Sequence, residues 1–212
     1  MARVDITPGN PVPLAGYFTL KSRISEGIRD RLYARAIAFR DKDLTVLLLI
    51  YDLLMTTEEM VQKLKGRLED TGARIIVTAT HTHSAPGGYW DSFVPRIALG
   101  AYDPEALDRL CAFGEEAARS AMEDLAACRI SVHQGRLPQL AKNRRDADGP
   151  VDDGLWALCI NRSKAGKGKA ILTGFPGHPV IVAERAFKQV SADFPGEVVR
   201  RIEEQVEFAA FI

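Results

Sequence analysis

The chain has 212 residues, of which 46% are hydrophobic and 26% charged, the composition of an ordinary globular protein able to bury a core. Lysine plus arginine equals aspartate plus glutamate at 28 each, so no global field attracts nucleic acid or an anionic membrane. The apolar run 44–50 is far shorter than the roughly 20 residues that a transmembrane helix needs. These properties argue against nucleic-acid-binding and membrane-spanning proteins.

The N-terminus and the cysteines bear on the compartment. Residues 1–5 lack the apolar stretch of a secretory signal, although removal of such a signal would leave the same start. The three cysteines are odd in number and show no CxxC spacing, which favours reduced, packed thiols over disulfides or a zinc knuckle. We therefore expect a cytoplasmic protein.

The first third of the chain predicts an extended segment and a hairpin. Residues 5–16 contain three prolines and two glycines, so they should run extended. The apolar runs 32–39 and 44–52, joined by a charged turn at 40–43, predict two paired strands. Asp52 ends the second strand.

Helical spacing dominates the next segments. Threonines and glutamates open a helix predicted at 57–71, and a β-rich run follows at 74–80. This strand, helix, strand order implies a parallel crossover. Apolar residues recurring every three or four positions predict a second helix at 104–127, and alternation predicts a strand at 130–137.

The last third predicts a second hairpin and a third helix. The runs 155–161 and 170–175 form the hairpin, with a glycine- and lysine-rich turn at 163–169. Residues 192–207 carry a helix start and an apolar stripe. We therefore expect a layered α/β fold in which helices flank a mixed sheet, with residues 1–212 forming a single domain.

Three of the four histidines follow predicted strands. His81 and His83 lie where strand 74–80 meets a proline- and glycine-rich loop, and His178 follows strand 170–175. In extended backbone, positions i and i+2 point the same way, so His81 and His83 can face one pocket. Ligands bind at the carboxyl ends of strands in open α/β sheets. The fourth, His133, lies within a predicted strand and is interpreted as structural.

The residue types favour a zinc site. Neutral imidazole is a preferred zinc ligand, and catalytic zinc usually has three protein ligands plus water. His81 and His178 alone are too few, so either His83 or Asp52 completes the set, or further ligands lie beyond residue 212. Asp52 fits two interpretations equally, an outer-shell residue that orients a histidine and a simple turn residue. The alternative for the histidines is a structural, hydrogen-bonded role.

The segment THTHSAPGGY at 80–89 resembles the THTHSGPGG signature of the neutral, non-lysosomal ceramidase family, with Ala85 in place of a glycine. Other matches follow in family order over nearly the whole chain. They are DITP at 5–8, GIRD at 27–30, LYAR at 32–35, NRR at 143–145, GHP at 177–179 and SADFPG at 191–196.

The resemblance implies a zinc-dependent hydrolase that cleaves the amide bond of ceramide or of another N-acyl compound. By similarity, His81 and His178 would bind Zn²⁺, and His83 and Arg144 would contact the substrate or the reaction oxyanion. These roles are physically reasonable, since zinc polarises a carbonyl and a nearby histidine or arginine stabilises charge on oxygen. Arg144 fits a solvated charged loop equally well.

The chain also departs from the family pattern. A Gly-Asp-x-Ser-Pro segment with a catalytic serine, later Glu and Tyr zinc ligands and an immunoglobulin-like domain do not occur within residues 1–212. The ending FAAFI reads as part of a strand, so we expect the N-terminal part of a longer catalytic domain. The alternatives are a degenerate metal-binding module of the same fold and a metal-dependent esterase or phosphoesterase. The expected partner is a small-molecule or lipid amide.

Overall fold

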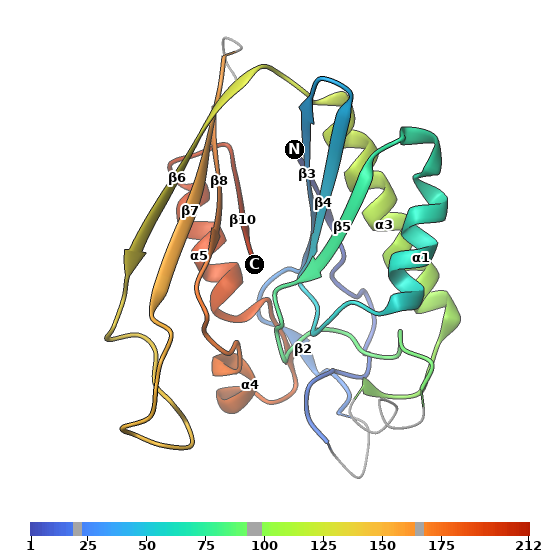
Figure 1. The fold of residues 1–212 in the computed structure, drawn as a ribbon. Helices are drawn as coiled ribbons and strands as arrows, with labels where there is room; N and C mark the ends of the chain where they lie inside the picture. Colours follow the sequence, from blue (N-terminus) through green and yellow to red (C-terminus); the bar gives the residue numbers. More distant parts are fainter. Residues whose placement is uncertain (19–22, 93–98, 164–167) are drawn as a thin grey trace. The chain divides into compact units, whose positions relative to one another are not determined.

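The computed structural model describes residues 1–18, 23–92, 99–163 and 168–212 (Figure 1). The chain divides into two compact units, each built from two separate stretches. The first contains Met1–Leu125 and Pro179–Glu197, and the second contains Ala126–His178 and Val198–Ile212. The expected α/β class, with sheets flanked by helices, is confirmed. The expected single domain stays a prediction.

The first unit contains a four-stranded mixed sheet in the order β1-β3-β4-β5. The predicted hairpin is confirmed, because β3 and β4 pair antiparallel. The predicted crossover is also confirmed, since β4 and β5 pair parallel and α1 connects them. The strands are β1 (Ala2–Asp5), β3 (Tyr33–Asp41), β4 (Leu44–Tyr51) and β5 (Arg74–Ala79).

Helix α1 (Glu58–Arg67) begins and ends for local reasons. The Thr57 side chain caps its N-terminus by accepting a hydrogen bond from the Met60 amide at 3.1 Å. A short 3₁₀ turn, η1 (Glu69–Thr71), extends the helical stretch to the predicted boundary. The chain then leaves through Gly72 in the left-handed conformation.

Helix α3 (Pro104–Glu123) packs with α1 on one face of this sheet (Figure 1). Asp103 caps its start, and Pro104 occupies the first turn, where a missing amide hydrogen costs little. The helix ends before the predicted residue 127 because the chain needs those residues to reach the strand that begins at Cys128. Side chains from the sheet, α1 and α3 form the core of the unit.

Gly114 lets α3 approach β4 closely. A Cβ atom there would lie 1.7 Å from the Tyr51 hydroxyl oxygen, which donates a hydrogen bond to the Leu110 carbonyl. We expect Gly114→Ala to lower the free energy of unfolding by about 1–3 kcal/mol, because Tyr51 must move. Gly66→Ala is the matched helical control, since nothing lies within 4 Å of its added Cβ. It should raise stability by about 0.5 kcal/mol in urea unfolding. Equal effects of the two changes would contradict this packing.

The second unit contains a mixed sheet in the order β10-β8-β7-β6. Three strands pair antiparallel, and β10 pairs parallel with β8 after α5 (Asp193–Glu203), so the sheet repeats the strand directions of the first unit. The predicted hairpin of β7 and β8 is confirmed, although 164–167 of its turn lie outside the described residues. The strands are β6 (Cys128–Arg136), β7 (Gly154–Arg162), β8 (Lys169–Gly174) and β10 (Phe208–Phe211).

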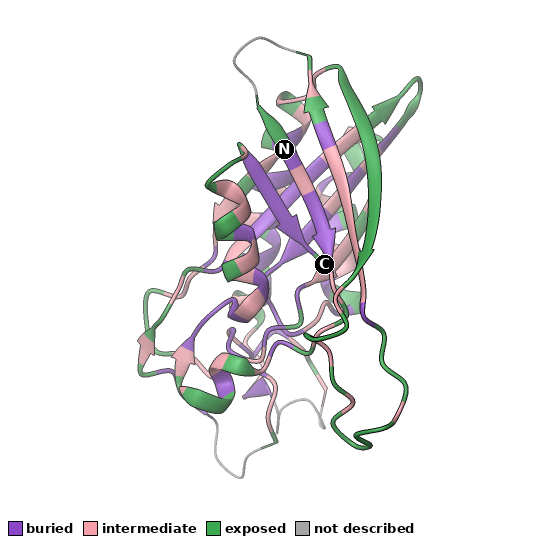
Figure 2. Cartoon of the chain, turned by 90° about the vertical axis from the view of Figure 1, so that its left-hand side faces the viewer, coloured by how far each residue is buried: buried purple, intermediate pink, exposed green. Residues whose placement is uncertain are grey.

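Burial differs between the strands of the second unit. β10 is buried along its length, whereas every residue of the edge strand β6 is exposed (Figure 2). Helix α5 is shorter than the predicted 192–207, because the chain turns after Glu203 to enter β10. Within the described ranges no helix is both long and apolar enough to cross a bilayer.

Three short elements were not predicted from the sequence. β2 (Gly27–Ile28) and β9 (Gln189–Val190) form a parallel pair in the first unit, and α4 (Ile181–Arg185) precedes β9. A two-residue strand has no periodicity for a pattern to detect. This pair nevertheless brings the GIRD segment at 27–30 beside the SADFPG segment at 191–196.

Candidate metal centre

The loop after β5 begins with a constrained backbone. His81 has φ 66°, a left-handed conformation that is uncommon for residues other than glycine. Such a conformation costs of order 1 kcal/mol and persists only where the surroundings hold it. The loop at His81 is therefore imposed by its neighbours.

Alternate residues of this loop are anchored inward. Thr82 and Ser84 are fully buried. The Thr82 hydroxyl donates to the Ser191 carbonyl at 2.7 Å, and the Ser191 amide donates to the Ser84 carbonyl at 2.8 Å. His81 and His83 alternate with these buried residues and are more exposed. The two imidazoles therefore lie together, as the sequence predicts, but His81 is left-handed and not in the extended backbone on which that prediction relied.

Backbone carbonyls fix both rings. The Leu54 carbonyl lies 2.7 Å from Nδ1 of His81, and the Gly16 carbonyl lies 2.9 Å from Nδ1 of His83. A carbonyl only accepts, so each Nδ1 carries the hydrogen, and the neutral form of each ring has its lone pair on Nε2. The two Nε2 atoms lie 3.4 Å apart. Two lone pairs that face each other at this distance need a cation or a shared proton between them.

His178 completes a group of three. The ligand nitrogens of His81, His83 and His178 all lie within 4.8 Å of one another. His178 directly precedes Pro179, and the Pro179 carbonyl accepts a hydrogen bond from the His83 amide at 3.2 Å. The prolines on either side of Gly177-His178 restrict this backbone.

The donor set suits zinc. Two nitrogens bound to one tetrahedral zinc at about 2.0–2.1 Å lie about 3.3 Å from each other. The spacing of the two Nε2 atoms matches this value. Three imidazoles also leave one position for water or substrate, the arrangement of catalytic zinc sites.

Asp52 contacts β3. Its Oδ2 accepts a hydrogen bond from the Tyr33 amide at 2.9 Å and forms an ion pair with the Arg35 guanidinium at 2.7 Å. Both side chains of this ion pair are buried. The ring of His81 is held by the Leu54 carbonyl. An outer-shell role for Asp52 stays a prediction, and its described contacts suit a strand-end structural residue.

Arg144 is exposed in the second unit, in the loop between β6 and β7. The Asn143 side chain shapes this loop by accepting hydrogen bonds from the amides of Arg145 and Asp146. The role of Arg144 toward an oxyanion stays a prediction. His133 lies on exposed β6 with its Nε2 3.0 Å from the Ser131 hydroxyl, which agrees with a structural interpretation.

Residues that the sequence did not single out support the histidine loop. Asp30 of the GIRD segment accepts hydrogen bonds from the Ser191 hydroxyl at 2.5 Å and the Ala192 amide at 2.7 Å. Burial raises the pKa of Asp30 above its ordinary value. Ser191 in turn holds Thr82 and Ser84. The motif positions could have suggested this link, but only the fold shows that the segments meet.

Similarity to known proteins identifies the family of the chain. Residues 1–210 match the family model described as neutral/alkaline non-lysosomal ceramidase, N-terminal. The chain belongs to this family. It is 29% identical over 144 residues to neutral ceramidase of Mycobacterium tuberculosis, covering 61% of this chain and 23% of that protein. It is 28% identical over 148 residues to neutral ceramidase 1 of Arabidopsis thaliana, covering 66% and 19% respectively.

Solved ceramidase structures share the fold. The neutral ceramidase from Pseudomonas aeruginosa superposes with a TM-score of 0.87 at 22% identity, over 99% of this chain and 37% of that one. A structure described as ceramidase complexed with C2 gives a TM-score of 0.86 at 21% identity, over 99% and 36%. The chain spans less than a quarter of the two curated ceramidases and little more than a third of these structures.

Proposed function

We propose that the chain supplies the histidine ligands of a zinc-dependent ceramidase-like hydrolase that cleaves a lipid amide. One observation carries the proposal: the carbonyls of Leu54 and Gly16 hold two imidazoles so that their Nε2 atoms face each other at 3.4 Å, with a third histidine beside them. Membership of the ceramidase family supports the same chemistry.

Each residue has a distinct part in this proposal. His81 and His178 would hold Zn²⁺, with His83 either as the third ligand or as a contact to the substrate oxygen. A bound zinc ion supplies Lewis acidity and lowers the pKa of a water molecule. With Nδ1–H committed to the Gly16 carbonyl, His83 presents an unprotonated Nε2 that can accept a proton. The Arg144 guanidinium would stabilise negative charge that develops on the amide oxygen.

The substrate class comes from the relatives. The named relatives are neutral ceramidases, so ceramide or a similar N-acyl lipid is the proposed substrate. Ester or phosphoester cleavage is the nearest alternative, because one metal site can support several hydrolytic reactions. The complete protein should be assayed with an N-acyl amide, the matching ester and a phosphoester. Preference for either alternative substrate would overturn the amidase proposal.

Arg144→Ala in the complete protein tests the proposed oxyanion role. We expect kcat to fall roughly 10²-fold or more, the usual cost of a lost oxyanion donor, with the zinc content unchanged. Arg145→Ala is the matched control, since it removes the same charge from the adjacent exposed position. Equal activity of the two variants would discard the role of Arg144. Zinc binding without turnover of any substrate would favour a non-catalytic module.

A further inference from the structure

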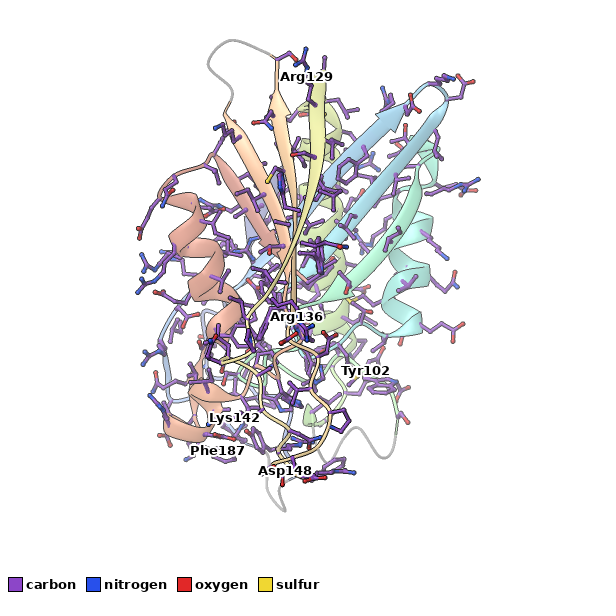
Figure 3. All side chains as sticks on the ribbon, turned by 60° about the vertical axis from the view of Figure 1, so that its left-hand side comes forward. Tyr102, Arg129, Arg136, Lys142, Asp148 and Phe187 are labelled. Carbon is purple, nitrogen blue, oxygen red and sulfur yellow. The ribbon has the colours of Figure 1, made fainter. Side chains whose placement is uncertain are left out.

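We propose that Arg23 is a positioning residue that fixes the ring of His83. The inference deepens the proposed metal centre and takes its functional meaning from it. The Arg23 side chain is only 4% exposed. Its guanidinium carbon lies 5.0 Å from the centre of the Tyr17 ring and 4.7 Å from the centre of the Phe187 ring. Phe187, which is labelled in Figure 3, lies between α4 and β9 in the sequence. Two aromatic faces therefore hold the cation in place.

The hydrogen bonds of Arg23 join the two backbone segments that hold His83. Nη2 of Arg23 donates to the carbonyl of Ala15 at 2.6 Å and also to the carbonyl of His83 itself. Ala15 directly precedes Gly16, whose carbonyl accepts from Nδ1 of His83. One guanidinium nitrogen thus connects the histidine backbone to the segment that orients its ring.

The aromatic contacts reach the same ring. Tyr17 packs edge-on against His83 at 5.4 Å between ring centres and against Phe187 at 5.3 Å. The series Phe187, Tyr17, His83 is therefore continuous, and Arg23 contacts all three. Removing Arg23 would loosen the ring packing and the carbonyl contacts of His83 together.

The environment of Arg23 is costly for a cation. Among the described residues, the contacts of its side chain are backbone carbonyls and ring faces, and its buried Nε and Nη1 have no hydrogen-bond partner. Burial lowers the pKa of Arg23 to about 10, so it stays charged at neutral pH. A buried cation held in this way contributes little stability, which favours a role in placing the adjacent site.

The test reads the protonated nitrogen of His83 in the metal-free chain by long-range ¹H–¹⁵N NMR. The wild-type ring should carry its hydrogen on Nδ1. In Arg23→Met, which keeps the packing between the rings but removes the donors, we expect a mixture of both tautomers. Arg23→Lys keeps the charge but lacks the planar guanidinium, so its share of the Nδ1–H tautomer of His83 should lie between those of the wild type and Arg23→Met. Zinc affinity, measured by chelator competition, should drop roughly tenfold in Arg23→Met, as for other outer-shell losses.

Leu68→Ala controls for instability, because Leu68 directly follows α1 and is fully buried in the core of the same unit. It should lower the melting temperature and leave the tautomer of His83 unchanged. A wild-type tautomer in both Arg23→Met and Arg23→Lys, or an equal shift in Leu68→Ala, would overturn the inference. If the complete wild-type protein binds no zinc, the proposed function fails, and the metal-free tautomer still decides the role of Arg23.

Discussion

Replacing His81 or His178 with alanine is expected to strip zinc from the purified protein. Each ring supplies one nitrogen to a group of three whose ligand atoms lie within 4.8 Å of one another. Losing one leaves too few ligands for a structural or catalytic zinc site. The affinity should therefore fall by more than the roughly 10–100-fold that loss of an outer-shell partner costs. Chelator competition and elemental analysis of the metal content measure the change.

His133→Ala is the matched control for these variants, since it removes the one histidine outside the group. Its zinc content should equal that of the wild type. Unchanged occupancy in both His81→Ala and His178→Ala would remove the metal hypothesis. His83→Ala then separates the two roles left open for that ring. The variant should lose zinc if His83 is a ligand and should keep zinc if His83 contacts only the substrate.

Gly16→Ala should damage the same centre without replacing any of its three histidines. Gly16 has φ 108°, where a side chain is strained, and an added Cβ would lie 2.5 Å from Nδ1 of His83. The ring must move away from the carbonyl that fixes its tautomer. We expect zinc affinity to fall at least roughly tenfold, as when an orienting partner is lost, and stability to fall by about 1–3 kcal/mol. Chelator competition and urea unfolding give the two values.

Gly9→Ala is the control for this change, because Gly9 lies in the same proline-rich segment and nothing surrounds its added Cβ within 4 Å. It should leave zinc affinity and stability close to those of the wild type. Wild-type zinc affinity in Gly16→Ala would show that the Gly16 carbonyl does not orient His83.

Local patterns were sufficient for much of the fold. The alternation and apolar runs predicted the β3 and β4 hairpin, the β7 and β8 hairpin and the parallel step from β4 to β5. Thr57 and Gly72 marked the limits of the first helical stretch. These features depend on periodicity and capping, which involve residues close together in the chain. Helix ends were less exact, because α3 and α5 stop where the chain must turn toward β6 and β10.

The sequence by itself predicted that His81 and His83 share one side of a loop, because positions two apart point the same way in extended backbone. The structure brings the two rings together with His81 in a left-handed conformation, which its neighbours impose. Only the tertiary structure decided what faces the two rings. The carbonyls of Leu54 and Gly16 that fix the two tautomers, and the buried Arg23 beside His83, contact the loop across long separations in the chain. A backbone carbonyl has no residue type, so no motif can reveal one that orients a ring.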